Sequence, residues 1–293
     1  MAETKNVFPG DLIPAGELSR RLGPSPSKPT PGRFLIMDYP IKSIDRFIAN
    51  ACTHMAFANY VNFGFTVANE GAAVVAALLA AGYTPREIYE LRASGKFIPI
   101  DLIEAKTKIT GRFHVQKKGA DHKGLRFREA VDRLIREKIG AGPGVDPLTP
   151  VSFAELAITR PVAFYITALD LTTGAVVTLS RDTHPTMAVA DAVLASCAVQ
   201  PYLRNLTFTD AVGPHLYAAC SNIATLPFLT AQGKAKEKRI PNFDSLAIGY
   251  GCSSTANEAG VKNASGTATQ KALQAQRAQA VVPAQLMSHF IMF

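Results

Sequence analysis

The sequence predicts an α/β fold built on a largely parallel sheet. Short apolar, strand-like runs alternate along the chain with helix-like runs, and this order is typical of parallel strands joined by helices. One helix-like run, residues 71–81, is apolar on every side and must therefore be buried all round, and a second run of small, mostly apolar residues, 188–199, is also expected to be buried. A third run, residues 127–139, places apolar side chains at helical spacing in a charged stretch and therefore predicts an amphipathic surface helix.

The first half of the chain supplies two strands and three helices in this scheme. Residues 1–33 are rich in Pro, Ser and Gly and are expected to form a flexible leader. Gly82 follows the first buried run in the position of a helix C-terminal cap, and Thr84 and Glu87 form a capping box that opens the next helix. The remaining predicted elements are a strand at 34–37, a helix at 44–60 and a strand at 63–67.

The second half predicts further strands around the other buried helix. Residues 104–124 read as a basic loop, and Ser152 with Glu155 forms a second capping box. Residues 162–169 and 175–179 flank a turn-forming segment, which predicts a β-hairpin. Further strands are expected at 215–218 and 245–248, and the main domain is expected to span 34–260, followed by an Ala- and Gln-rich tail at 261–293.

The chain is basic, with a formal net charge of +8 and a pI of about 9.3. Such a balance favours anionic partners. Much of the excess lies in two clusters, which are interpreted first as solvated loops and second as a membrane-surface footprint. The candidate partners are a lipid or membrane surface and a protein, and no nucleic acid is expected because no nucleic-acid-binding motif accompanies the charge. The clusters are Lys106, Lys108, Arg112, Lys117, Lys118, Lys123, Arg126 and Arg128, and then Lys234, Lys236, Lys238 and Arg239.

Neither the cysteines nor the glycines form a cofactor motif. The four cysteines are scattered without a C-x-x-C pair, which argues against a disulfide framework and a zinc site and favours a cytosolic compartment. Gly249-Tyr250-Gly251 is too short for a nucleotide site, so no cofactor or metal is expected. The N-terminus has no signal-peptide pattern, and no apolar run reaches the roughly 18 residues that span a bilayer. We therefore expect a cytoplasmic protein or one peripheral to a membrane, with secretion by a machine that reads other signals left open.

Five segments, in order, resemble the patatin-like phospholipases, a family of lipid acyl hydrolases. They cover roughly residues 34–250 and imply a three-layer α/β sandwich of patatin-like type. The segments are Val75–Pro85, like the helix after that family's nucleophile; Leu148–Leu156, like "lTFaeL"; Ala168–Gly174, like "AtDlxtG"; Asp191–Ala198, like "dAvrASsA"; and Leu226–Phe228, like the end of "DGGxxxNlPv".

The resemblance implies a Ser–Asp dyad, yet the aligned positions carry neither residue. Family members place the nucleophilic serine in a G-x-S-x-G turn between a strand and a helix. Counting back from the buried helix puts Glu70 at the position equivalent to this serine, or Asn69 if one residue is inserted. Counting back from Leu226 puts Ala219 at the position of the aspartate base, followed by Cys220 and Ser221.

The glycine-rich loop that binds the oxyanion in that family is also replaced. Its equivalent here is Asp38-Tyr39-Pro40-Ile41-Lys42-Ser43. Pro40 has no N–H to donate, and the carboxylate of Asp38 would repel a developing negative charge. Lys42 matches a basic position of that loop. With all three motifs changed, the sequence favours a catalytically inactive relative that binds lipid or a protein.

Two other interpretations stay open at the level of sequence. An active lipid acyl hydrolase could use Cys220, with His215 as its base, or Glu70 as the nucleophile, although an odd spacing of five places Cys220 and His215 on opposite faces of a strand. Alternatively, the chain is an inactivated or redesigned form of a patatin-like phospholipase, since the losses concentrate at catalytic positions. A metal site of Asp38, Glu70 and His54 or His215 has no supporting spacing.

Overall fold

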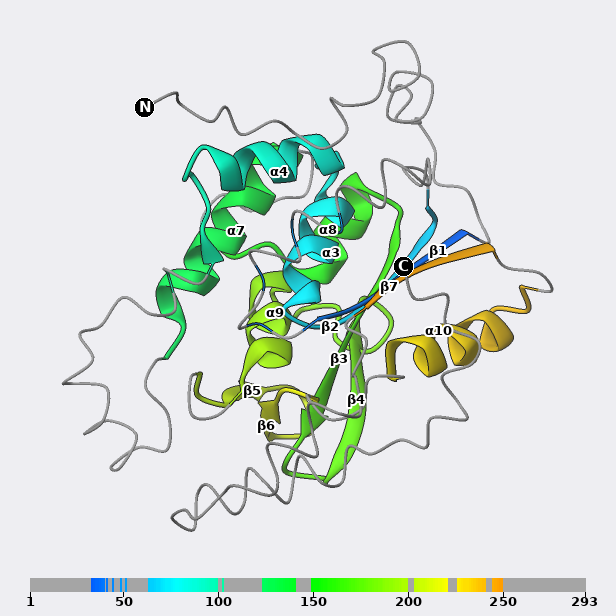
Figure 1. Ribbon diagram of the computed structural model, residues 1–293. Helices are drawn as coiled ribbons and strands as arrows, with labels where there is room; N and C mark the ends of the chain where they lie inside the picture. Colours follow the sequence, from blue (N-terminus) through cyan, green and yellow to red (C-terminus); the bar gives the residue numbers. More distant parts are fainter. Residues whose placement is uncertain are drawn as a thin grey trace, which may run out of the picture.

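The computed structural model confirms an α/β fold, in which a mixed sheet of parallel and antiparallel strands lies between helical layers (Figure 1). It describes residues 33–39, 63–99, 123–140, 149–199, 203–220, 226–240 and 244–249, together with positions 41, 44, 48, 51 and 102. The sheet order is β5-β6-β3-β2-β1-β7, and β4 pairs with β3. The strands are β1 Arg33–Tyr39, β2 Phe65–Glu70, β3 Ala163–Asp170, β4 Ala175–Ser180, β5 Leu206–Thr209, β6 Pro214–Ala218 and β7 Asp244–Gly249.

The parallel part of the sheet consists of β7, β1, β2 and β3, whereas β4 and β6 pair with β3 in the antiparallel sense and β5 is antiparallel to β6. Asn69 of β2 pairs with Thr167 of β3, and farther along β3 Leu169 pairs with Ala218 of β6. Because β4 occupies the other edge of β3, β6 must lie on the same side as β2, just beyond its carboxyl end. The residues that follow β6 therefore return toward the end of β2.

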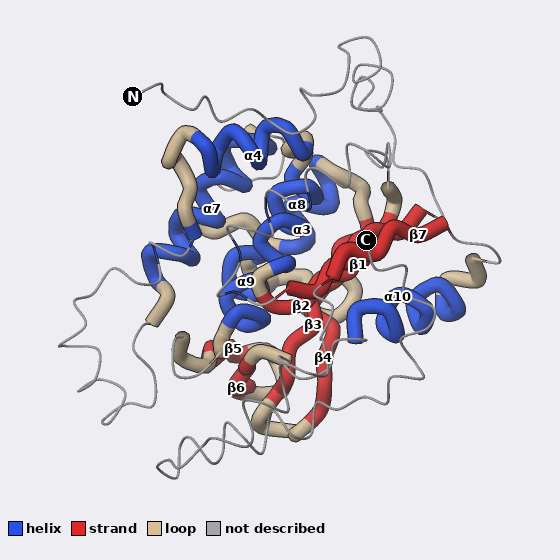
Figure 2. Tube along the Cα trace, viewed as in Figure 1, coloured by secondary structure: helices blue, strands red, loops and turns tan. Residues whose placement is uncertain are grey.

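Helices cover both faces of this sheet, giving three layers (Figure 2). On one face lie α3, α4, α7, α8 and α9, and on the other lies α10. Successive side chains of a strand point to opposite faces of the sheet, so Leu35 and Met37 belong to the larger core, and Phe34 and Ile36 pack in the core beneath α10. The helices are α3 Ala72–Ala81, α4 Pro85–Ala93, α7 Leu125–Ile139, α8 Phe153–Thr159, α9 Val189–Cys197 and α10 Leu226–Glu237.

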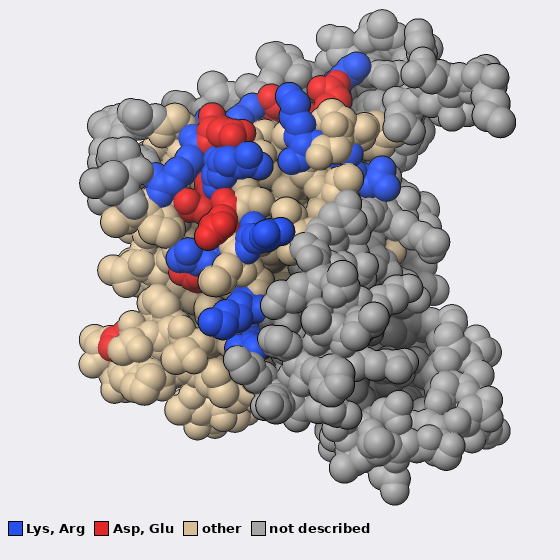
Figure 3. Space-filling view, turned by 90° about the vertical axis from the view of Figure 1, so that its left-hand side faces the viewer, with Lys and Arg blue, Asp and Glu red and all other residues tan. Residues whose placement is uncertain are grey.

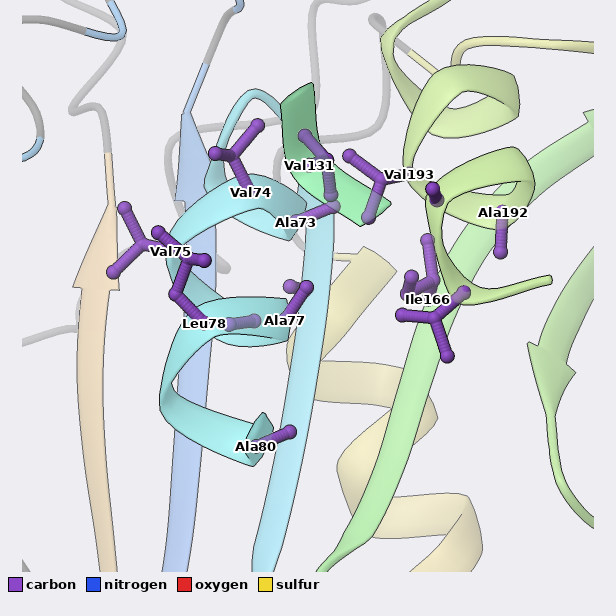
Figure 4. Packing of buried hydrophobic residues seen from close by; sticks show 14 of the residues in the cluster. Ala73, Val74, Val75, Ala77, Leu78, Ala80, Val131, Ile166, Ala192 and Val193 are labelled. Atoms are coloured by element: carbon purple, nitrogen blue, oxygen red, sulfur yellow. The ribbon is translucent and has the colours of Figure 1, made fainter. Parts of the chain in front are cut away.

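Helix α3 is the centre of the larger core (Figure 4). All ten of its residues are buried, as expected for a helix that is apolar on every side. Val131 of α7, Ile166 of β3 and Val193 of α9 lie around it. The predicted end of this helix is confirmed, because Gly82 adopts a left-handed conformation with φ of 105° and its N–H bonds the last turn.

Other local predictions are also confirmed. Thr84 and Ser152 both form complete capping boxes, with Glu87 and Glu155. The hairpin of β3 and β4 forms as expected, and α7 buries its apolar face only. Among the described residues, no helix is both long and apolar enough to cross a bilayer.

Three predictions about elements need correction or were incomplete. The second strand runs to Glu70, whereas the sequence predicted an end at Val67. The prediction was too short because Asn69 and Glu70 are polar and resemble loop residues, although both are buried in the structure. The strand β5 and the helix α10 were not predicted as elements. The strand β1 begins at Arg33, one residue inside the expected leader, and ends at Tyr39, so Asp38 and Tyr39 belong to the strand and not to the predicted oxyanion loop. The rest of the leader, most of 44–60, most of the basic loop and the tail at 261–293 lie outside the described residues.

Candidate functional site

The turn between β2 and α3 is short and conformationally strained. Only Gly71 separates Glu70, the last strand residue, from Ala72, the first helical residue. Glu70 has φ of 51°, a left-handed conformation that costs a non-glycine residue on the order of 1 kcal/mol. A strained residue at a strand-to-helix turn persists only where its surroundings hold it, and such residues cluster at functional sites.

The surroundings hold Glu70 through its backbone. Its N–H donates to the Ser196 hydroxyl at 2.8 Å, and the Cys197 thiol donates to its carbonyl oxygen at 3.2 Å. Both partners come from the last turn of α9 and are fully buried. The end of α9 therefore fixes the turn from the side opposite to β1.

Gly71 lets the chain segment after β1 pass directly against this turn. A Cβ atom added to Gly71 would lie 2.8 Å from the Cα atom of Ile41 and 3.1 Å from the carbonyl oxygen of Tyr39. Since Gly71 itself has an ordinary helical φ of −59°, the glycine is required by space and not by its dihedral angle. The carboxyl ends of β1 and β2 thus meet closely, at the edge of an open α/β sheet where ligands generally bind.

The amide of Asn69 connects three segments at this edge. Its Nδ2 donates to Asp38 Oδ1 at 3.1 Å and to the carbonyl oxygen of Cys220 at 3.2 Å, and its Oδ1 accepts from the Thr167 hydroxyl at 2.9 Å. Asn69 is 2% exposed, so every one of these bonds lies in a region of low dielectric. With both amide atoms engaged, Asn69 positions its neighbours and presents no reactive group.

The carboxyl groups of Asp38 and Glu70 lie close enough to influence each other. Burial raises the pKa of Asp38 to about 8 because it outweighs the hydrogen bond from Asn69, which lowers the pKa, and the nearby charge of Glu70 adds a smaller increase. Asp38 is therefore largely protonated at neutral pH and can donate a proton or a hydrogen bond. A carboxylic acid kept neutral by burial is a common participant in acid–base chemistry.

Cys220 and His215 are not brought together as a nucleophile and its base. Burial raises the pKa of the Cys220 thiol to about 12, with smaller contributions from Glu70 and Asp38. His215 instead binds Asp170 through Nδ1 at 2.9 Å and faces Asp210 through Nε2 at 3.6 Å. A thiol without an adjacent base and with a raised pKa is a poor nucleophile.

A second polar cluster surrounds Asp170 at the end of β3. Its carboxylate accepts from the backbone N–H of Thr172 at 2.9 Å, from the Thr173 hydroxyl at 2.9 Å and from His215. Burial opposes ionisation of Asp170, but these donors lower its pKa to about 2. Asp170 thus holds the β3–β4 turn in place, and its bond to His215 has no signal in sequence spacing.

The remaining predicted site residues have simple outcomes. Ala219 lies between β6 and Cys220, with its N–H bonded to the Ala198 carbonyl oxygen at 3.2 Å. Pro40, Lys42, Ser43, Ser221 and His54 lie outside the described residues. Within the described part of the chain, no group of three or more His, Cys, Asp or Glu side chains could hold a metal ion.

The basic residues that the structure describes are largely balanced by acidic ones. Arg128 binds Asp191 through two nitrogens, and Lys234 and Lys238 bind Glu237 and Asp182. On the face shown in Figure 3, Lys and Arg side chains alternate with Asp and Glu. The described part of this face is thus of mixed charge, and Lys106, Lys108, Arg112, Lys117 and Lys118 lie outside the described residues.

Comparison with known proteins yields weak structural similarities. Neither a protein-family model nor a curated protein sequence matches the chain. The type III effector protein ExoU is similar over 87% of this chain and 52% of its own, with 16% identity and a TM-score of 0.36. VipD from Legionella pneumophila is similar over 80% and 53%, with 10% identity and a TM-score of 0.40.

A further structure, full-length ExoU with full-length SpcU from the type III secretion system of Pseudomonas aeruginosa, is similar over 58% of this chain and 39% of that one. It shows 17% identity and a TM-score of 0.37. The chain therefore spans about half or less of the length of these proteins. Similarity at this level does not extend to activity, substrate or partners.

Proposed function

We propose that this chain is a patatin-like domain that does not hydrolyse lipids by a Ser–Asp mechanism and instead binds a lipid acyl group or a protein. The supporting observation is the strand-to-helix turn, which has the geometry of a nucleophile elbow but carries Glu70. The small residues Ala68 and Ala72 flank it, as the G-x-S-x-G pattern requires of its outer positions, and both are fully buried.

The chemistry of the surrounding groups supports a binding role. Acyl transfer requires a nucleophile, a base and donors aimed at the oxyanion. Beside Glu70 lie a second carboxyl group, Asp38, and a thiol with a raised pKa, Cys220. Ala219 occupies the position proposed for the base and cannot accept a proton. Removal of such parts together abolishes catalysis, because they act as a unit.

A second candidate function is ester hydrolysis in which Glu70 is the nucleophile. The observation that favours it is the left-handed backbone at Glu70, since strained non-glycine residues often occur at active sites. Attack by the Glu70 carboxylate on an acyl ester would give a mixed anhydride and release the alcohol, with protonated Asp38 supplying the proton. Water would then cleave the anhydride and return Glu70 to its carboxylate.

Free fatty acid release from mixed phospholipid vesicles distinguishes the two functions. The wild-type protein is compared with Glu70→Ala, with Cys220→Ala and with a blank, each protein being shown to be folded by circular dichroism. We expect no release above the blank from any of them. Release by the wild type that Glu70→Ala abolishes and Cys220→Ala preserves would establish Glu70 chemistry and refute the binding role. Release lost in Cys220→Ala would point to the thiol.

A related experiment asks whether the turn descends from an active site. The double variant Glu70→Ser, Ala219→Asp restores the dyad, and glycines at positions 38–40 restore the loop. Recovered hydrolysis would mean that the chain is an inactivated form of a patatin-like phospholipase. A folded, inert variant would exclude that origin as the sole explanation.

A further inference from the structure

We propose that the tips of the β3–β4 and β5–β6 hairpins form a docking surface for the uncharged interface of a lipid bilayer. We call this surface the apolar tip, and it consists of Leu171, Val176, Val212 and Leu216. The inference rests on the proposed binding of lipid, and it names the surface through which the protein would reach a membrane.

Exposed apolar side chains gather at this tip. The exposed fractions are 87% for Val212, 44% for Leu171, 40% for Val176 and 37% for Leu216. The other large hydrophobic residues that are exposed in the described part of the chain lie one each on separate helices: Leu125 on α7, Ile158 on α8 and Leu229 on α10. Isolated residues of this kind are ordinary, whereas a contiguous group marks an interaction surface.

The two hairpin tips form one unit because hydrogen bonds join them. The N–H of Leu171 donates to the carbonyl oxygen of Leu216 at 2.8 Å, and the N–H of Leu216 donates to the Thr172 hydroxyl at 2.9 Å. Beneath them, His215 bridges Asp170 and Asp210. The apolar side chains therefore project from two hairpins that hydrogen bonds and ion pairs hold together.

The charge distribution selects the uncharged lipid interface as the occupant. From Asp170 to Val176 and from Leu206 to Ala218 the chain contains no Lys or Arg. Besides the buried Asp170, the acidic residue of these two stretches is Asp210, whose Oδ1 accepts from the N–H groups of Val212 and Gly213 and faces His215, so its charge is compensated within the loop. Without basic residues, attraction to anionic headgroups is not the driving force, and burial of apolar surface is.

The size of the tip argues against a second copy of the chain as the occupant. A stable dimer buries roughly 800 Å² of each partner. Four partly exposed aliphatic side chains supply much less than this, but insertion of a few apolar side chains is sufficient for reversible contact with a bilayer.

The apolar tip also lies at the same end of the sheet as the candidate site. Asn69 of β2 pairs with Thr167 of β3, and Asp170 lies three residues farther in the same direction. At about 3.3 Å per residue, the tip begins about 10 Å beyond the level of Asn69. The lower end of the view in Figure 1 shows this projection of the β3–β4 hairpin. A bilayer touching the tip would face the carboxyl ends of β1 and β2.

The absence of tryptophan from the chain allows a direct test. Val212→Trp introduces a single fluorophore at the tip, and Ile158→Trp is the matched control because Ile158 is 62% exposed on α8. On addition of phosphatidylcholine vesicles, we expect a blue shift and quenching by brominated lipid for Val212→Trp and neither for Ile158→Trp. An unchanged spectrum of Val212→Trp, or equal shifts in both variants, would overturn the proposal.

Vesicle sedimentation gives an independent measurement with the otherwise unaltered chain. The double variant Leu171→Asp, Val212→Asp should bind phosphatidylcholine vesicles at least tenfold more weakly than the wild type, and Ile158→Asp should bind like the wild type. Unaltered circular dichroism spectra establish that all three proteins are folded. Equal binding by the double variant and the wild type would contradict a role of the tip.

The failure of this proposal can be separated from failure of the proposed function. Binding of a monomeric fatty acid reports on the candidate site without a bilayer, and it should be unchanged in the double variant. Loss of vesicle binding with retained fatty acid binding supports the tip. If the protein binds fatty acid, but the double variant binds vesicles as well as the wild type does, the role of the apolar tip is refuted and the proposed function is not. If the wild type binds neither fatty acid nor vesicles, both the proposed function and the role of the tip are refuted. Concentration-dependent sedimentation of the wild type, abolished in the double variant, would identify a second copy as the occupant instead.

Discussion

Asp38 and Asp170 lie near the carboxyl ends of two parallel strands of one sheet, and the pKa values of their carboxyl groups are shifted in opposite directions. Burial beside Glu70 raises the pKa of Asp38 to about 8, whereas three donors lower that of Asp170 to about 2. Asp170 is thus a structural anion whose charge is fully used to hold two hairpins together. Among the described residues, Asp38 accepts one side-chain hydrogen bond, from Asn69, and has the like charge of Glu70 nearby, and carboxyl groups with such a raised pKa are frequent at functional sites.

Two glycines test how differently the two regions are built, and they carry the largest expected effect. Gly71→Ala should destabilise the fold by about 3 kcal/mol or more, because its Cβ would overlap the backbone of Ile41 at 2.8 Å. Gly174→Ala in the β3–β4 turn should cost only about 1 kcal/mol, since its φ is 70° but nothing lies within 4 Å of the added atom. Urea unfolding of both variants measures the difference, and equal losses would mean that the β2–α3 turn can shift.

Removal of the structural anion should have the next largest effect. Asp170→Ala removes the buried carboxylate that accepts from Thr172, Thr173 and His215, and we expect a loss of about 3 kcal/mol at pH 7 because hydrogen bonds to a charged group are lost. The same measurement on Asp38→Ala should show a much smaller loss or a gain. If Asp38→Ala is the more damaging variant, the distinction between the two aspartates is wrong.

The pH dependence of stability should reverse between the two aspartates. The folded-state pKa of Asp38 lies above its ordinary value of 3.8, so the stability it contributes is present below about pH 4 and is lost as the pH rises toward 8. Asp38→Asn should therefore be as stable as the wild type near pH 4 and more stable by a few kcal/mol at pH 9, at about 1.4 kcal/mol per pKa unit.

Asp170→Asn is the control with the opposite sign. Its folded-state pKa lies below 3.8, so the stabilisation is present above that pH and is lost as the pH falls from about 4 to 2. Unfolding by urea at pH 2.5, 4, 7 and 9 covers both windows. If the free energy of unfolding changes identically between pH 4 and 9 in the wild type and in Asp38→Asn, the pKa of Asp38 is not raised in the folded protein.

The sequence predicted the local parts of this comparison and not its long-range parts. Gly82 and the two capping boxes act within a few residues, and the all-apolar α3 leaves no exposed face, so these elements followed from spacing alone. The bond from Asn69 to the Cys220 carbonyl joins residues 151 positions apart, and that from His215 to Asp170 joins residues 45 apart. Such contacts depend on β6 lying in line with β2, which no local pattern encodes.

The boundary of β2 shows the same limit. Asn69 and Glu70 looked like loop residues because they are polar, but tertiary partners bury both at the end of the strand. Ser196 likewise belonged to an apolar helix pattern, and its bond to Glu70 N–H had no signal in the sequence. Conflict between local pattern and final structure is expected at functional or strained sites.

The coupling between the two carboxyl groups of the candidate site should give the smallest measurable effect. Glu70→Gln keeps the size of the side chain and removes its charge, so the pKa of Asp38 should fall because one of the causes that raise it is gone. An NMR titration that follows the side-chain carboxyl carbon of Asp38 measures this pKa directly. The pKa of Cys220 should fall as well, since Glu70 also raises it. Glu129→Gln, on the exposed side of α7, should leave both values unchanged. Because burial is the larger cause for both groups, the pKa of Asp38 should stay above 3.8 even in Glu70→Gln. A return to that value would show that the neighbouring charge, and not the enclosed position, keeps Asp38 protonated.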